Sequence, residues 1–185
     1  MSFFKWVTPN QLTLARMVIV PLLLYLIVLR EPIYNVVGFG LFALAGLTDY
    51  LDGVLARSRD EVSPLGKLLD PIADKMLVSS SLIMLVYIGI ADVVPTIVIL
   101  MRDFAVSGLR QVAAVEGVVI EAEQGGKLKT MVQMLAIGFM LLHHNPVIGY
   151  ELEIGRVLLW ASMVLTLSSG FNYFQQYFKK VVKSA

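Results

Sequence analysis

Hydrophobic residues form six long stretches along the chain, separated by short segments that contain polar residues, glycine or proline. Each stretch is close to the roughly 20 apolar residues that an α-helix needs to cross a bilayer. We therefore predict an all-α fold, a bundle of six transmembrane helices preceded by a short aromatic and basic interfacial segment. The interfacial segment is predicted at residues 3–10, and the spans at 11–29, 33–56, 66–87, 96–115, 126–143 and from 157 onward.

Composition supports a membrane protein. Of the 185 residues, 57% are hydrophobic and only 16% are charged, which is more apolar surface than a soluble domain of this size can bury. No repeat or long linker divides the sequence, so we predict one membrane domain over residues 1–185. The absence of cysteine excludes disulfides, thiolate metal sites and a cysteine nucleophile. No small-residue cleavage site follows the first residues, so we expect the amino-terminal segment to stay attached.

Basic residues indicate the orientation in the membrane. With six spans, both termini, the second-to-third connection and the fourth-to-fifth connection share one side. The basic residues of that side are Lys5, Arg57, Arg59, Lys67, Lys127, Lys129, Lys179, Lys180 and Lys183. The other side has Arg30 and Arg156. By the positive-inside rule, we predict a multi-pass protein of the bacterial cytoplasmic (inner) membrane, with both termini facing the cytoplasm.

Four aspartates lie where the second and third predicted spans meet this cytoplasmic side. Asp49 and Asp52 are three residues apart, and Asp70 and Asp74 are four apart, so on helices each pair shares one face. An aspartate at the centre of a membrane helix costs about 2.5 to 3.5 kcal/mol. Positions near helix ends cost less, but the acids still need counter-charges. The spacing predicts a carboxylate cluster that binds hard divalent cations, two of which would balance four carboxylates.

The alternative for these aspartates is a set of ion pairs at a solvent-accessible helix end. The available basic partners are Arg57, Lys67 and Lys75. Two helically phased acid pairs around a segment that contains glycine and alanine favour the metal site over this alternative.

Basic side chains within the other predicted spans indicate an anionic substrate. Arg16 shares a helix face with Asn10 and Thr13, and snorkelling to the membrane surface is the alternative to an anion-binding role. Arg102 and Arg110 lie in the fourth span. The fifth span opens with two lysines in the segment GKLKT, where free amides and the helix dipole also favour an anion. Beside a divalent-metal site, such groups indicate a phosphate-containing substrate, and a lipid could enter from the bilayer.

The pattern Asp49-x2-Asp52-Gly53-x2-Ala56-Arg57-x8-Gly66-x3-Asp70-x3-Asp74 resembles, without a departure, the signature of the CDP-alcohol phosphatidyltransferases. The resemblance implies two divalent cations, Mg²⁺ or Mn²⁺, bound by the four aspartates, with Asp74 also acting as the base. It implies that the cytidine diphosphate of the lipid substrate is bound by Asp49, Gly53, Ala56, Arg57 and Gly66. The acceptor hydroxyl would attack the lipid-bearing phosphorus, and CMP would leave.

Three further stretches resemble one branch of this family, the bacterial phosphatidylglycerolphosphate synthases. They are Asn10-x2-Thr13-x2-Arg16, Arg102-Asp103-x3-Ser107-x-Leu109-Arg110 and Gly126-Lys127-x-Lys129-Thr130-x2-Gln133. The resemblance implies CDP-diacylglycerol as donor, glycerol 3-phosphate as acceptor and a homodimer; we expect no nucleic-acid partner. A phosphorylated acceptor needs cations, so we assign its phosphate to Arg110, Lys127 and Lys129, with Arg102 and Arg16 as further candidates. Asp103 would weaken this assignment if it neutralised Arg102.

Two alternative functions remain at this point. The same chemistry could use another acceptor, such as inositol phosphate or serine. A divalent-cation transporter would also place carboxylates in the membrane, but its acids should line a path across the bilayer. Here all four acids gather at one end of the predicted bundle, which counts against transport.

Overall fold

The computed structural model describes the backbone of residues 9–59, 64–116, 124–143 and 149–184, and the side chains of residues 14–48, 72–73, 75–116, 128–143 and 149–180. Over this part of the chain it has six α-helices and no β-strand. The helices are α1 (Pro9–Leu29), α2 (Pro32–Arg59), α3 (Pro64–Tyr87), α4 (Val93–Val115), α5 (Gln124–Leu141) and α6 (Glu151–Ser184). The predicted all-α fold and the number of helices are therefore confirmed.

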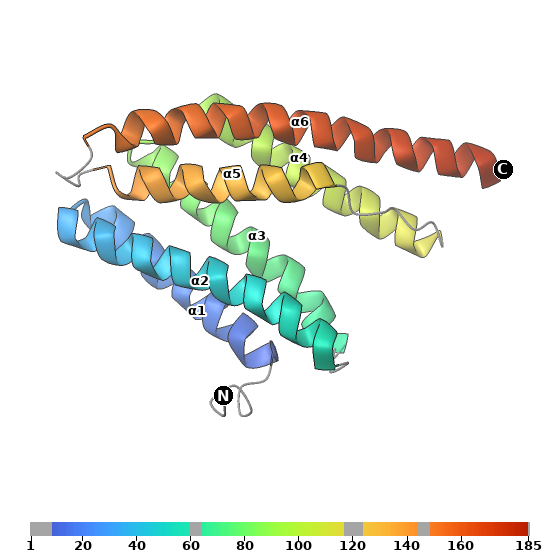
Figure 1. The fold of residues 1–185 in the computed structure, drawn as a ribbon, viewed down its shortest axis with the longest axis horizontal. Helices are drawn as coiled ribbons and strands as arrows, with labels where there is room; N and C mark the ends of the chain where they lie inside the picture. Colours follow the sequence, from blue (N-terminus) through green and yellow to red (C-terminus); the bar gives the residue numbers. More distant parts are fainter. Residues whose placement is uncertain (1–8, 60–63, 117–123, 144–148, 185) are drawn as a thin grey trace.

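Successive helices run back and forth through one bundle (Figure 1). α1 packs against α2 and α3, α5 packs most extensively against α6, and α6 also packs against α4. The end of α2, the start of α3, the end of α4, the start of α5 and the end of α6 all lie toward the right-hand side of Figure 1. We call this side the acidic end of the bundle, because the predicted aspartates lie on its helices.

Proline and left-handed backbone positions explain several helix boundaries. Pro9, Pro32 and Pro64 each occupy the first helical position, where the missing N–H costs nothing. Gly89 lies between α3 and α4 with φ of 82°, and Gly149 precedes α6 with φ of 78°, conformations that glycine adopts without strain.

Three predicted boundaries were wrong by at least three residues. α4 begins at Val93, three residues before the predicted start at 96. α2 continues to Arg59, so Arg57, which we expected in a polar connection, is helical. α6 begins at Glu151, six residues before the predicted start at 157. Charge alone suggested a polar boundary at this point, but acidic residues in the first turn favour a helix start because they complement the helix dipole.

The core lies where the helices cross. Fully buried side chains from α1, α3, α5 and α6 meet there, including Leu23, Leu82, Ile137 and Leu159. At Gly155, α5 and α6 approach so closely that a Cβ atom would lie 3.0 Å from the backbone nitrogen of Met140. The backbones of α5, which carries Lys129, and α6 are therefore in close contact at Gly155.

A group of contacts joins the α3–α4 turn to α6 at the end opposite the aspartates. Trp160 donates from Nε1 to Asp92 Oδ2 at 2.8 Å, and Arg156 donates from Nε to the carbonyl of Ile90 at 3.0 Å. Asp92 directly precedes α4, so these bonds fix the start of α4 against α6.

The surface is strongly apolar, as expected for a membrane protein. Large side chains such as Val18, Tyr87 and Phe171 are each at least 70% exposed. Among the described side chains, the segment Glu151–Lys180 is the one that has both the length and the apolar character to cross a bilayer. Shorter apolar helical segments cover Leu14–Leu29, Pro32–Thr48, Lys75–Tyr87 and Leu128–Leu141. The six-span arrangement stays a prediction.

Candidate active site

The backbone brings the two predicted acid pairs to the same end of the bundle. Asp49 and Asp52 lie within the last three turns of α2, and Asp70 and Asp74 within the first three turns of α3. These two helix ends are adjacent in the chain and lie at the acidic end in Figure 1. Since the side chains of these four residues are outside the described part, the shared metal site stays a prediction.

The positions predicted for the cytidine diphosphate lie on the same two helix ends. Gly53, Ala56 and Arg57 belong to the last two turns of α2, and Gly66 to the first turn of α3. Their side chains are also outside the described part. Among the side chains that are described, no three histidine or acidic groups come close enough to hold a metal ion. The aspartates of α2 and α3 were predicted as metal ligands from the sequence, and this stays a prediction.

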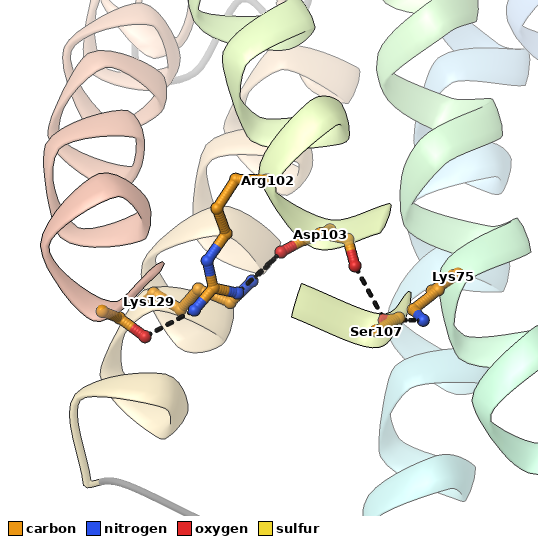
Figure 2. A network of polar contacts seen from close by, with 6 residues as sticks. Lys75, Arg102, Asp103, Ser107 and Lys129 are labelled. Atoms are coloured by element: carbon orange, nitrogen blue, oxygen red, sulfur yellow. Dashed lines mark hydrogen bonds and ion pairs between the residues drawn. The ribbon is translucent and has the colours of Figure 1, made fainter. Parts of the chain in front are cut away.

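A polar network joins α3, α4 and α5 near these helix ends (Figure 2). Lys75, the residue after Asp74, donates from Nζ to Ser107 Oγ on α4. Ser107 Oγ in turn donates to the backbone oxygen of Asp103 at 2.7 Å. Lys129 of α5 donates to Asp103 Oδ1, the same oxygen that Arg102 contacts. The fourth and fifth helices are thus connected to the helix that carries Asp70 and Asp74.

The side chain of Arg102 extends from α4 to the surface of α6. Its NH1 donates to Asp103 Oδ1 at 3.0 Å and its NH2 to Ser169 Oγ at 2.6 Å. The guanidinium carbon is 5.6 Å from the centre of the Tyr173 ring, within the range of a cation–π contact. Gly170 leaves room for it, since a Cβ there would be 3.0 Å from Arg102 Cγ and 3.1 Å from Nε. Arg102 Nε is buried without a hydrogen-bond partner among the described atoms.

Among the side chains that the structure describes, cations outnumber carboxylates in this network. Its described members include three cations, Lys75, Arg102 and Lys129, and one carboxylate, Asp103. The Arg102 and Lys129 side chains are each only 10% exposed. Because charges in such a setting are weakly screened, Arg102 and Lys129 favour a nearby anion.

The other predicted acceptor residues differ in their surroundings. Arg16 is only 2% exposed, so it does not snorkel to the surface. Arg110 is exposed and has no hydrogen-bond or ion-pair partner among the described residues. Gln133, one helical turn after Lys129, is buried, and its Nε2 has no partner among the described atoms. Lys127 lies in the first turn of α5, and its side chain is outside the described part.

The alternative that Asp103 pairs with Arg102 is present in the structure, and it weakens the assignment of Arg102 to the acceptor phosphate. Asp103 also contacts Lys129. The α6 residues Ser169, Gly170 and Tyr173 were not predicted as part of a site. The signal available for them was weak: a serine and a glycine adjacent in an apolar span allow close helix packing and interhelical hydrogen bonds.

Comparison with known proteins places the chain among related enzymes. The family model of CDP-alcohol phosphatidyltransferase matches residues 6–168. The chain belongs to the CDP-alcohol phosphatidyltransferase family. The family match includes every predicted metal and CDP-binding position and ends one residue before Ser169.

Three relatives of this CDP-alcohol phosphatidyltransferase carry specific enzyme names. The CDP-diacylglycerol–glycerol-3-phosphate 3-phosphatidyltransferase of Rickettsia bellii is 38% identical over 169 residues, which cover 90% of this chain and 93% of that protein. The enzyme of the same name from Bacillus subtilis is 37% identical over 180 residues, covering 91% and 93%. A probable phosphatidylglycerophosphate synthase of Mycobacterium tuberculosis is 39% identical over 167 residues, covering 89% and 78%.

Proposed function

We propose that this chain transfers the phosphatidyl group of CDP-diacylglycerol to glycerol 3-phosphate, giving phosphatidylglycerol phosphate and CMP. The names of its relatives support this reaction. The structural observation that carries it is the polar network from Lys75 through Ser107 and Asp103 to Lys129. This network links the cations Arg102 and Lys129 to Lys75, the residue beside Asp74. A phosphorylated acceptor bound there would meet the base.

The donor site is proposed on the helix ends that carry the family signature. Carboxylates at spacings of three and four on α2 and α3 are a suitable donor set for two Mg²⁺ or Mn²⁺ ions. Such ions, when bound, neutralise phosphoryl oxygens and align the diphosphate for displacement. Gly53, Ala56 and Gly66 allow the nucleotide to approach the helix backbone closely, and Arg57 adds positive charge beside it. Asp74 accepts the proton of the attacking hydroxyl.

The acceptor site is proposed on the cationic side of the network. Lys129 and Lys127 lie in the first two turns of α5, where the helix dipole also favours an anion. Arg110 belongs to the last two turns of α4 and is exposed. The end of α4 lies at the acidic end of the bundle in Figure 1. Arg102 and Arg16 contribute charge from buried positions. These cations would attract a phosphate dianion.

We further propose that all six helices cross the bacterial cytoplasmic membrane, with both termini and the acidic end facing the cytoplasm, and that the protein is a homodimer. The exposed apolar surface and the distribution of basic residues support this arrangement. The lipid then reaches the acidic end from the bilayer, and the water-soluble acceptor reaches it from the cytoplasm.

The test is CMP release by the purified full-length protein in detergent, with CDP-diacylglycerol and Mg²⁺ or Mn²⁺. Glycerol 3-phosphate, inositol phosphate, inositol and serine are compared as acceptors, and a chelator arm tests the metals. We expect release that depends on glycerol 3-phosphate and stops with chelator. Release with a different acceptor only would overturn the acceptor assignment. Divalent-ion uptake into proteoliposomes without CMP release would instead support the transporter alternative.

A further inference from the structure

Asp103 has an unusual position among the cations of the network. One of its carboxylate oxygens, Oδ1, accepts from Arg102 on its own helix and from Lys129 on α5. Its side chain is 22% exposed, so the ion pairs are partly shielded from water. Asp103 of α4 is therefore a partner that holds the amino group of Lys129 (Figure 2).

Arg102 is fixed from the other side by α6. Ser169 accepts from its NH2, the Tyr173 ring lies over the guanidinium carbon, and Gly170 leaves space for the flat side chain. These contacts do not depend on Asp103. The guanidinium can therefore act as a rigid donor that holds the Asp103 carboxylate in one orientation.

We propose that Asp103 is a positioning residue for the acceptor phosphate. It holds the Lys129 amino group at the point where the phosphate binds, while Arg102, anchored on α6, holds Asp103. This inference rests on the proposed function. A lysine side chain is long and flexible, so fixing it before the acceptor arrives lowers the entropy lost on binding. The single negative charge of Asp103 is offset by Arg102, so the cluster keeps its preference for an anion.

The first test is Asp103→Asn, which keeps the size of the side chain and removes its charge. We expect the KM for glycerol 3-phosphate to rise about tenfold, the equivalent of about 1.4 kcal/mol. The KM for CDP-diacylglycerol should change less than about twofold, because Asp103 does not act on the lipid. Asp92→Asn is the matched control, since Asp92 lies at the opposite end of the bundle, and both KM values should stay unchanged. An equal rise in both KM values, no rise, or tighter binding of glycerol 3-phosphate would overturn the proposal.

The second test asks whether Asp103 acts through Lys129. In a double-mutant cycle with Lys129→Met, Asp103→Asn should add less than about twofold to the KM for glycerol 3-phosphate, because the group that it positions is already absent. Full additivity of the two changes would overturn the proposal. Should Asp103→Asn fail to fold, Ser169→Ala replaces it: loss of this anchor of Arg102 should raise the same KM selectively, and no selective rise would overturn the proposal.

A third measurement does not depend on turnover. Acetylation of Lys129 in the folded protein is followed by mass spectrometry. It should be several times faster in Asp103→Asn than in the unaltered protein, because the amino group is no longer held by the carboxylate. An equal rate would overturn the proposal that Asp103 holds this amino group. The choice of acceptor by the unaltered protein distinguishes failure of the proposed function from failure of the Asp103 proposal. If it uses inositol phosphate instead of glycerol 3-phosphate, the proposed function fails and the same KM comparison tests Asp103 with that acceptor. If it uses only an acceptor without phosphate, both proposals fail.

Discussion

Replacing Gly155 by alanine should weaken the contact between α5 and α6. A Cβ at this position would lie 2.6 Å from Met140 Cγ, 3.0 Å from the backbone nitrogen of Met140 and 3.2 Å from the backbone oxygen of Ala136. A flexible side chain could move aside, but the two backbone atoms belong to α5 and move only with that helix. The substitution therefore forces the two helices apart.

The expected size of the effect follows from two opposing terms. Overpacking of a well-packed contact typically costs about 1 to 3 kcal/mol, and backbone neighbours place this site toward the upper end. Alanine regains about 0.8 to 1 kcal/mol over glycine within a helix. The net loss in the free energy of unfolding is about 1 to 2 kcal/mol. For a chain of this length, that loss lowers the melting temperature by roughly 2 to 8 °C.

Thermal unfolding in one detergent, followed by circular dichroism, measures this loss. Gly40→Ala is the matched control, because a Cβ on that exposed glycine of α2 meets nothing within 4 Å. The control should be as stable as the unaltered protein or slightly more stable. If Gly155→Ala proved as stable as Gly40→Ala, the close approach of α5 and α6 at Gly155 would be refuted.

Three further predictions concern the two ends of the bundle. Asp74→Asn should abolish CMP release while binding of metal and CDP-diacylglycerol is largely retained, because the amide cannot accept the proton; full activity would contradict its role as base. Lys127→Ala should chiefly raise the KM for glycerol 3-phosphate, and an effect confined to the CDP-lipid would contradict its placement. Trp160→Phe should cost about 1 kcal/mol of stability through the lost hydrogen bond to Asp92. Its kcat per folded molecule should be unchanged, since this bond lies far from the acidic end; equal stability would show that the bond contributes nothing.

The helices were predictable because their signal is local. Long apolar stretches, and prolines at the starts of α1, α2 and α3, place most boundaries within a few residues. The start of α6 was wrong because charge at Glu151 and Glu153 fits both a polar boundary and the first turn of a helix. The acid pairs were visible as a motif, and their backbone positions follow from the two helices that carry them.

The contacts of the cationic residues were less predictable. The sequence places Arg102 next to Asp103 but does not reveal that Lys129, 26 residues later, contacts the same carboxylate oxygen. Nor does it reveal that Ser169 of α6 anchors Arg102. Both contacts depend on how α4, α5 and α6 pack together, and the spacing of residues along one helix contains no information about its neighbours.

The length of α6 determines how deep Arg102 and its α6 partner Ser169 would lie in a bilayer. Ser169 is 18 residues after Glu151, the first residue of α6, and this corresponds to about 27 Å along the helix axis. The hydrocarbon layer is about 30 Å thick. If α6 enters this layer at its first turn, Ser169 and Arg102 lie about 3 Å inside the opposite boundary, just below the lipid headgroups. A lipid phosphate and a water-soluble phosphate ester can meet near this boundary. The lipid headgroup need not leave the membrane surface, and the ester need not enter the hydrocarbon layer.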